Sequence, residues 1–414
     1  MAVGRLAVLL ALGVTSVAGQ AKGYRHGNWI AGTNAPDEIK AQWADKPPLV
    51  GPAPDARKSP VRPPAPKDRP PREPVALGDA LWKSPAIRPI EDQDVVIGLA
   101  LNYKLGSHSA FVGTLRRTGY KGDIILATEP LKKMQLASAN FLKDMGVVAF
   151  PLEPDCSASK GGSIKHKTCL WREGQPALPL AIIRHALYHA IASMYPPSAQ
   201  FYVADYRDTF FQRNPFEAYS EIHGKPRLKG LDLVVVAEHW PFKQIGNCPF
   251  NGGWVRGCWG ADVHQRLQHQ NVLCSGSYMG AQPAIVNFEE TLLASADVDE
   301  CHFKGVPSDQ GYLNYLFYSG LLPSETVVES RGSGVVNTVG SLDGSRPRKA
   351  GFLPDSHVNI GEYWHMRDAD GFVMQDDSVS KSAAVHQYDR FHLEFTTFVA
   401  ELGLCDPPET CYRP

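Results

Sequence analysis

The sequence predicts an α/β fold with a mixed, mainly parallel central sheet flanked by helices. Three short apolar runs, at residues 95–101, 124–128 and 147–152, have the composition of strands that are buried on both faces. Segments with helical spacing separate these runs, at residues 109–120 and 130–144. Strands that alternate with helices in this way indicate crossover connections and a parallel sheet.

Composition places the chain among ordinary globular proteins. Of its 414 residues, 43% are hydrophobic and 21% are charged. The length fits one large α/β domain with additional segments, or two to three domains. The formal net charge is −1, so no basic field favours nucleic acid and we expect no nucleic-acid partner.

The first 20 residues have the pattern of a secretory signal peptide. Arg5 precedes an apolar core from Leu6 to Val14, and small residues that suit cleavage follow near residue 19 or 20. This run is shorter than the roughly 20 residues that a membrane helix needs. A short uncleaved signal anchor is the alternative, so a membrane tether is expected through the N-terminus only.

Residues 21–75 have the composition of a proline-rich stalk or linker. Prolines and scattered basic residues dominate residues 46–74, which favours extended polyproline II conformations over a packed core. A ligand for a proline-recognising domain is the alternative. We expect the folded domain over residues 76–414.

Eight cysteines in a chain with a secretory signal predict disulfides. Eight cysteines allow about 105 pairings, so the sequence does not fix the connectivity. Proximity along the chain favours the pairs Cys156–Cys169, Cys248–Cys258, Cys274–Cys301 and Cys405–Cys411.

A long amphipathic helix is expected over residues 178–195. It carries Arg184, His185 and His189, and histidines on such a helix are more often packed in the core than bound to a ligand. The apolar, β-prone run Phe201–Ala204 follows the helix.

That strand is expected to end in two carboxylates and an arginine, Asp205, Arg207 and Asp208. Open α/β folds bind ligands at the carboxyl ends of their strands. Two aspartates three residues apart can converge on one hard divalent cation, such as Mg²⁺ or Mn²⁺. The alternative is a turn with a local Asp–Arg ion pair that leads into a helix N-cap.

Three segments continue the domain. Residues 231–240 form a further expected strand that ends in Glu238, and residues 241–259 look like a loop. Residues 271–296 are expected to form a small-residue turn that enters a helix. Glycine there permits close backbone approach, and a helix N-terminus suits phosphate or hydroxyl groups.

A second short helix is expected over residues 308–320, with Ser308 as its N-cap and Asp309 and Gln310 in its first turn. Strand-like pieces follow at residues 327–342 and 372–391. The latter delivers His386 after an apolar pair, as a metal ligand at a strand end would be. The alternative for His386 is a hydrogen-bonded surface histidine.

Four segments, taken in order, resemble the GT-A-fold nucleotide-sugar glycosyltransferases of the eukaryotic secretory pathway. They are FYVADYRDTFFQRNPF at 201–216, VLCSGSYMG at 272–280, SDQGYLNYL at 308–316 and AVHQYDR at 384–390. Their order and spacing resemble that layout over residues 94–391. One departure is that the usual Asp-x-Asp motif is replaced by Asp-x-x-Asp, so the metal could be held by both Asp205 and Asp208 or by one of them alone, and Arg207 could instead contact a diphosphate.

The resemblance implies a site and a reaction. Asp205 and Asp208 would bind Mn²⁺ or Mg²⁺ on the diphosphate of a UDP- or GDP-sugar donor, and His386 would be a third ligand. Such an ion acts as a Lewis acid on the leaving diphosphate. Asp309 and Gln310 would contact the donor sugar or the acceptor near the reacting carbon. Asp309 is a candidate base if the enzyme inverts, and a positioning group if it retains.

The remaining implied cofactor-binding residues are Arg184, Arg207, Ser275 and Gly276. The implied activity is hexosyl or pentosyl transfer to a glycan or protein acceptor in the Golgi lumen or the secreted space. A catalytically inactive carbohydrate-binding protein of the same fold is one alternative. A secreted metal-dependent hydrolase is another, although the sequence has neither a Gly-x-Ser-x-Gly elbow nor an HExxH motif.

Overall fold

The computed structural model describes eleven parts of the chain. They are residues 74–82, 92–157, 168–171, 177–238, 243–299, 309–323, 325–332, 334–342, 372–375, 380–390 and 393–404. The predicted signal segment, nearly all of the predicted stalk, and Ser308 lie outside these residues.

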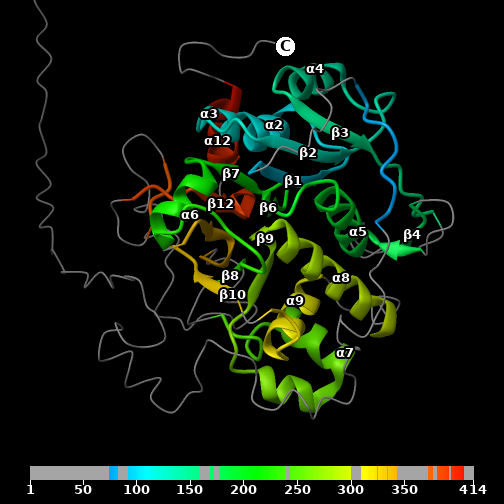
Figure 1. Ribbon diagram of the computed structural model, residues 1–414, viewed down its shortest axis with the longest axis vertical. Coiled ribbons are helices and arrows are strands. Elements are labelled where there is room, and N and C mark those ends of the chain that lie inside the picture. Colours follow the sequence, from blue (N-terminus) through cyan, green and yellow to red (C-terminus); the bar gives the residue numbers. More distant parts are fainter. Residues whose placement is uncertain are drawn as a thin grey trace, which may run out of the picture.

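A seven-stranded sheet forms the centre of the molecule, in the order β10-β8-β9-β6-β1-β2-β3 (Figure 1). Its strands are β1 (Asp94–Ala100), β2 (Asp123–Thr128), β3 (Val147–Pro151), β6 (Gln200–Ala204), β8 (Leu233–Ala237), β9 (Leu273–Ala281) and β10 (Thr326–Ser330). All neighbouring pairs are parallel except the two that involve β9, which runs antiparallel to both β6 and β8. The predicted class, a mixed and mainly parallel α/β sheet, is confirmed.

Helices cover both faces of this sheet (Figure 1). One apolar core lies under α5 (Leu180–Ala192), α8 (Gln282–Asp299) and α9 (Asp309–Tyr318). The other lies under α4 (Leu136–Asp144), α6 (Pro215–His223) and a continuous helical segment at 105–117. That segment consists of α2 (Leu105–His108), the π-helical turn η3 (Ser109–Gly113) and α3 (Thr114–Arg117). Strands buried on both faces explain why their sequences are continuous apolar runs.

A small second sheet, in the order β11-β12-β7, lies beside the carboxyl end of β6. It contains β7 (Thr209–Phe211), β11 (Val336–Thr338) and β12 (Ala384–His386). The short helices η6 (Val339–Leu342) and η8 (Tyr388–Arg390) and the helix α12 (Leu393–Leu404) complete this side. Strands β4 (Thr168–Cys169) and β5 (Leu178–Pro179) form a separate pair before α5.

The segment at 74–82 packs against the outer strand of the sheet. The backbone N–H of Leu81 donates to Ala149 O at 2.8 Å, and Trp82 Nε1 donates to Val147 O at 3.0 Å. Val75 and Leu77 pack against the main core. Val75, the last residue of the predicted stalk, therefore already contacts the folded domain.

The loop predicted at 241–259 is wrong, because a helix, α7 (Pro249–Leu267), occupies most of it. Its sequence is poor in helix formers, and Gly260 interrupts it with φ 88°. Packing compensates: the Trp259 ring stacks on Tyr315 of α9 with centroids 4.0 Å apart, and Val263 is buried beside it. Tertiary packing, and not local helix propensity, therefore stabilises helix α7.

The small-residue turn predicted at the start of 271–296 is also wrong. Ser275 and Gly276 lie inside strand β9, and helix α8 begins only at Gln282. Every residue of β9 is buried, so the strand lacks the alternation that identifies half-buried strands. The register against β8 shifts between Val235 and Val236, opposite this part of β9. Such irregularities often lie next to functional sites.

One predicted disulfide is confirmed and two are wrong. Cys156 and Cys169 are bonded, while Cys248 and Cys274 are free and buried. Cys258 is disulfide-bonded, but not to Cys248. Proximity along the chain fails here because Cys248 caps the start of α7, where its sulfur accepts from the Asn251 N–H. The predicted Cys405–Cys411 pair lies outside the described residues.

Within the described segments, no helix has both the length and the apolar character that a membrane crossing requires.

Candidate active site

Strand pairing brings Asp205, Asp208 and His386 together at the carboxyl edge of the sheet. Asp205 directly follows β6, and its backbone N–H donates to Gly276 O of β9 at 2.6 Å. Asp208 directly precedes β7, which pairs antiparallel with β12 so that His386 lies opposite Thr209. Residues far apart in the sequence thus meet because β6 and β12 end, and β7 begins, at one place.

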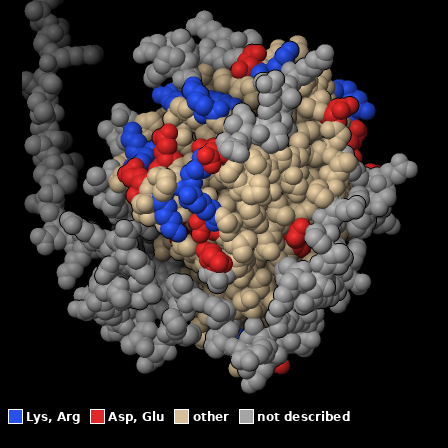
Figure 2. All heavy atoms as spheres, in the orientation of Figure 1, with Lys and Arg blue, Asp and Glu red and all other residues tan. Residues whose placement is uncertain are grey.

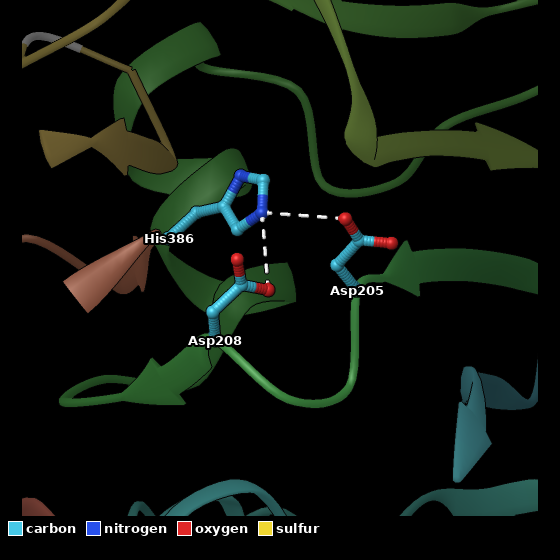
Figure 3. Close-up of side chains that lie close together, drawn as sticks. All are labelled: Asp205, Asp208 and His386. Carbon is cyan, nitrogen blue, oxygen red and sulfur yellow. Dashed lines mark ion pairs between the residues drawn. The ribbon is translucent and has the colours of Figure 1, made fainter. Parts of the chain in front are cut away.

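The three side chains surround a small gap (Figure 3). His386 Nε2 lies 3.5 Å from an Asp208 carboxylate oxygen and 3.7 Å from an Asp205 carboxylate oxygen. Both distances are too long for a hydrogen bond. Within the described residues this buried Nε2 atom has no hydrogen-bond partner. Since buried polar atoms are almost always bonded, the gap indicates a place for a ligand.

Gly276 keeps the gap open from the side of β9. A Cβ at this position would come within 2.6 Å of Asp205 Oδ2 and 2.8 Å of His386 Nε2, and would also collide with the imidazole Cε1. Glycine is therefore required by space. Ser275, its neighbour, is buried and lines the same cavity as the two aspartates.

These three residues fit a divalent cation. Their ligand atoms all lie within 4.8 Å of one another. Two ligands of an octahedral Mg²⁺ at about 2.1 Å are roughly 3 to 4 Å apart, so small side-chain shifts suffice. Two carboxylates with one imidazole suit Mn²⁺ as well as Mg²⁺.

Electrostatics couple Asp208 and His386. Burial raises the pKa of Asp208, but the His386 imidazole outweighs burial and holds that pKa below its usual value. Burial lowers the pKa of His386, but the Cys274 sulfur and Asp208 outweigh it and raise that pKa. The Cys274 sulfur lies 3.3 Å from His386 Nδ1, on the side of the ring that faces away from the gap.

Arg184 links the aspartate cluster to helix α9. Its guanidinium donates to carboxylate oxygens of both Asp205 and Asp309. Burial raises the pKa of Asp309, but Arg184 and His185 more than offset this and lower it to about 2. Asp309 is therefore ionised, paired and a weak proton acceptor.

A tightly bonded cluster lies beneath this pair. His185 Nδ1 lies 2.6 Å from Glu289 Oε2, and the Tyr278 hydroxyl donates to the other Glu289 oxygen. His185 Nε2 lies 3.4 Å from Asp309 Oδ2. His185 is thus a packed core residue, as predicted, and it supports the position of Asp309.

Arg207 and Gln310 have different acidic partners. Half-exposed Arg207 pairs with Asp389 at 3.0 Å and lies 3.8 Å from Asp208. Gln310 Nε2 donates to Glu238 Oε1 at 3.0 Å, and Glu238 also pairs with Lys243.

Asp205 and Asp208 line a cavity of about 680 Å³. All the predicted site residues line this cavity except Gly276 and His386, and both of these lie close to Asp205, which does line it. Further polar or aromatic residues of its lining are Asn102, Tyr103, Glu129, Lys133, Glu153, Tyr188, Tyr206, Phe250, Trp254, Gln387 and Arg390.

Several of these lining residues follow strands that the sequence analysis had identified. Asn102 and Tyr103 follow β1, Glu129 follows β2, and Glu153 follows β3. Asn102 has φ 59°, and its backbone N–H donates to Glu129 Oε2 at 2.7 Å. The strand-end rule that identified Asp205 would have found all four. No comparable sequence signal indicates Gln387, which has φ 65° and donates its N–H to Asp208 O.

Charged residues of both signs are interspersed on the face of the molecule in Figure 2. Lys and Arg lie beside Asp and Glu there and do not form a continuous basic surface. The absence of a nucleic-acid partner stays a prediction.

Comparison with known proteins gives only distant structural likeness. No protein-family model matches the chain, and no curated protein matches it. The galactosyltransferase LgtC, solved with donor and acceptor sugar analogs, is 14% identical, with a TM-score of 0.40 over 74% of this chain and 95% of that one. An active-site mutant of LgtC is 13% identical, with the same TM-score and coverage.

The bifunctional glycosyltransferase WbbM, solved in its apo form, is 11% identical with a TM-score of 0.40. The similarity covers 73% of this chain and 47% of that one. Likeness at this level does not establish a shared activity, which must be inferred from the site itself.

Proposed function

We propose that the protein is a divalent-metal-assisted glycosyltransferase that moves a sugar from a nucleotide-sugar donor to a glycan or protein acceptor in the secretory pathway. The observation that carries this proposal is the gap between Asp205, Asp208 and His386. It is buried, lined by two carboxylates, bordered by an unbonded imidazole nitrogen, and kept open by Gly276. It opens on a cavity large enough for a nucleotide sugar.

The three residues would hold Mn²⁺ or Mg²⁺. When bound, the ion would supply Lewis-acid stabilisation of the negative charge on a leaving diphosphate. The imidazole among the ligands favours Mn²⁺ over Mg²⁺, because Mg²⁺ prefers oxygen ligands. Arg207, half-exposed beside Asp208, would contact the same diphosphate.

The nucleoside would lie toward β1 and β2. Tyr103 there offers a ring for a base, and Asn102 and Glu129 offer polar groups for a ribose. The sugar would then lie on the other side of the metal ligands, between Arg184 and Gln310. UDP and GDP are the donor nucleotides that we propose to test.

The reaction exchanges a glycosyl–phosphate bond for a glycosidic bond. The bond from the anomeric carbon to the phosphate oxygen breaks, and its electron pair goes to the diphosphate. An acceptor hydroxyl oxygen bonds the anomeric carbon, and its proton passes to a carboxylate or to the departing diphosphate. Asp309, ionised and paired with Arg184, suits positioning of the sugar better than proton abstraction, since its pKa is about 2.

The secretory location rests on the signal-like N-terminus and agrees with the Cys156–Cys169 disulfide. Disulfides persist in oxidising compartments. The division into signal, stalk and catalytic domain stays part of this proposal.

Release of nucleoside diphosphate from a panel of UDP- and GDP-sugars tests the activity. The full chain should release UDP or GDP from at least one donor with Mn²⁺, and Asp208→Asn should not. If the chain binds a nucleotide sugar with Mn²⁺ but never turns it over with any acceptor, it is a carbohydrate-binding protein instead. If no donor binds at all, the transferase proposal is wrong.

A further inference from the structure

An aromatic pair, the exposed Phe250 and the partly buried Trp254, lines the end of the cavity that helix α7 contributes. Phe250 has 63% of its surface exposed, and it is the one aromatic residue among the exposed large apolar side chains of the described residues. Trp254, one helical turn later, has its ring 6.2 Å from the Phe250 ring, with an interplanar angle of 41°. Both residues line the cavity that contains Asp205. Exposed aromatic surface at a cavity is a common mark of a ligand site.

The pair is held by a rigid support. Trp259, on the same helix, stacks on Tyr315 of α9 and is buried. Val255 is also buried beneath the helix. Because residues four apart share one face of a helix, Phe250 and Trp254 are presented together while the opposite face packs in the core.

Polar groups complete this end of the cavity. Gln310 and Asp309 at the start of α9 line the same space as the aromatic pair. The Trp254 indole N–H makes no hydrogen bond with any other described residue and is therefore a donor that a ligand can use. An aromatic ring face together with a planar amide and a carboxylate suits a sugar. The C–H face of a sugar ring is apolar and stacks on the aromatic ring, and its hydroxyls bond the amide and the carboxylate.

We propose that Phe250 and Trp254 form the acceptor subsite and that the acceptor is a glycan whose terminal pyranose stacks on this pair. This inference rests on the proposed function and narrows it, because it selects a sugar hydroxyl over a peptide hydroxyl as the acceptor. The donor sugar lies between the metal ligands and Gln310, and the acceptor pyranose lies beyond it, against α7.

The choice of a glycan follows from the shape and chemistry of this end. An extended peptide needs backbone donors and acceptors along its length, whereas Phe250 and Trp254 offer ring faces and one N–H. Phe250 and Trp254 line the cavity from α7, whereas Tyr103 and Glu129 line it from the segments after β1 and β2, so the acceptor and the nucleoside would contact different elements. A pyranose at this place would present a hydroxyl toward the reacting carbon.

Saturation-transfer NMR on the full chain tests the subsite directly. The probes are methyl glycosides of glucose, galactose, mannose, xylose and N-acetylglucosamine, each added with UDP or GDP and Mn²⁺. A serine-rich peptide is the competing probe. We expect at least one glycoside to receive saturation at its ring C–H protons, and the peptide to receive none.

Variants then locate the binding. Phe250→Ala and Trp254→Ala should each weaken the responsive glycoside about five- to tenfold, the worth of one aromatic contact. Phe250→Tyr should retain wild-type affinity, and Leu136→Ala, which removes an even more exposed apolar side chain on α4, should change nothing. Equal glycoside binding in wild type, Phe250→Ala and Trp254→Ala would overturn the proposal, as would binding of the peptide in place of the glycosides.

Nucleotide binding separates this inference from the proposed function. Thermal stabilisation by UDP or GDP with Mn²⁺ should be unchanged in Phe250→Ala and Trp254→Ala. If nucleotide stabilises all three proteins but no glycoside binds, the acceptor subsite is wrong and the transferase proposal stands. If nucleotide stabilises none of them, the proposed function fails, and the acceptor assignment fails with it.

Discussion

The two ends of strand β6 carry polar groups that differ in how completely they are bonded. At the amino end, Asp94 accepts from Gln200 Nε2 at 2.8 Å and from Arg227 Nη1 at 3.0 Å. Gln200 Oε1 in turn accepts from the Leu228 N–H at 3.1 Å. At the carboxyl end, His386 Nε2 lies 3.5 and 3.7 Å from its two carboxylates and bonds neither.

This difference distinguishes a structural cluster from a binding site. At the amino end the Asp94 carboxylate and both polar atoms of the Gln200 amide are hydrogen-bonded, and among the described groups there only Arg227 Nε is left without a hydrogen bond, 3.7 Å from an Asp92 carboxylate oxygen. The carboxyl-end groups are gathered by three strands and a glycine, yet they remain apart. A native exception to hydrogen bonding needs an explanation, and a bound cation is one that fits both the chemistry and the space.

The largest change in stability is expected from Arg184, which bonds the carboxylates at the carboxyl end, and it is compared with Arg227 at the amino end. Arg184→Met leaves the buried Asp309 carboxylate and the partly buried Asp205 carboxylate without their shared cation, which should reduce the free energy of unfolding by about 3–5 kcal/mol. Arg227→Met is the matched control. Asp94 keeps its bond from Gln200 there, so a loss of about 1–2 kcal/mol is expected. Urea unfolding with and without Mn²⁺ measures both.

Mn²⁺ should restore part of the stability of Arg184→Met and none of that of Arg227→Met, because only the first lies beside the proposed metal. Equal losses in the two variants, with no response to Mn²⁺, would count against the distinction between the two ends.

His108 gives a pH test at the carboxyl edge itself. Its Nε2 faces Tyr103 O at 3.2 Å and its Nδ1 faces the Tyr206 hydroxyl at 2.7 Å, so the neutral ring is fully bonded. Burial lowers the pKa of His108 to about 4. The unfolded chain, with a pKa of about 6.5, binds the proton more readily, so stability should fall as pH drops from about 6.5 to 4.

A difference of about 2.5 pKa units corresponds to about 3 kcal/mol. Urea unfolding between pH 7 and pH 4 should show this extra loss in the wild type and not in His108→Gln. If the free energy of unfolding fell equally in the two proteins as the pH dropped, His108 would not be a neutral histidine with a lowered pKa in the folded protein.

Asp208→Asn should weaken Mn²⁺ binding at least about 100-fold, because it removes a charged metal ligand. The matched control is Asp94→Asn, which removes the same charge from the hydrogen-bonded groups at the amino end of β6. It should cost about 1–3 kcal/mol of stability and leave Mn²⁺ affinity unchanged. Electron paramagnetic resonance of free Mn²⁺ measures the affinity. Similar Mn²⁺ affinities in the two variants would place the metal elsewhere.

Gly276→Ala should weaken Mn²⁺ about tenfold, because the added methyl occupies the gap beside His386 Nε2 and Asp205 Oδ2. Gly253→Ala, on helix α7, adds a methyl that meets nothing within 4 Å. It should leave Mn²⁺ affinity unchanged and add about 0.5–1 kcal/mol of stability. The same Mn²⁺ titration compares them, and an unaffected Gly276→Ala would show that the gap is not the binding place.

The sequence predicts the sheet well because its strands are continuous apolar runs, which do not depend on distant partners for recognition. It also indicates Asp205 and Asp208, since acids that follow a strand stand at the ligand-binding edge. The mistakes at Ser275 and Gly276 have a physical cause. Strand β9 is buried on both faces and borders the gap, so it is built from small residues there. A run of small residues in a sequence is usually typical of a turn.

Other features could not be read from the sequence because they depend on packing between distant segments. Cys274 forms no disulfide and lies beside His386, and this position depends on how β9 and β12 pair with their neighbouring strands. Helix α7 is stabilised by the stacking of Trp259 on Tyr315 of α9. The link from Asp205 through Arg184 to Asp309 joins three elements whose spacing along the chain gives no signal.

Calorimetric titration of UDP and GDP into the full chain tests the central claim most directly. With Mn²⁺ present, one of the two nucleotides should bind at least about tenfold more tightly than in EDTA, since ion and diphosphate share a site. Asp208→Asn should lose this difference, and Asp94→Asn should keep it. Nucleotide affinity that is equal with Mn²⁺ and with EDTA, or absent in both, would contradict a metal-assisted nucleotide-sugar site at the carboxyl end of β6.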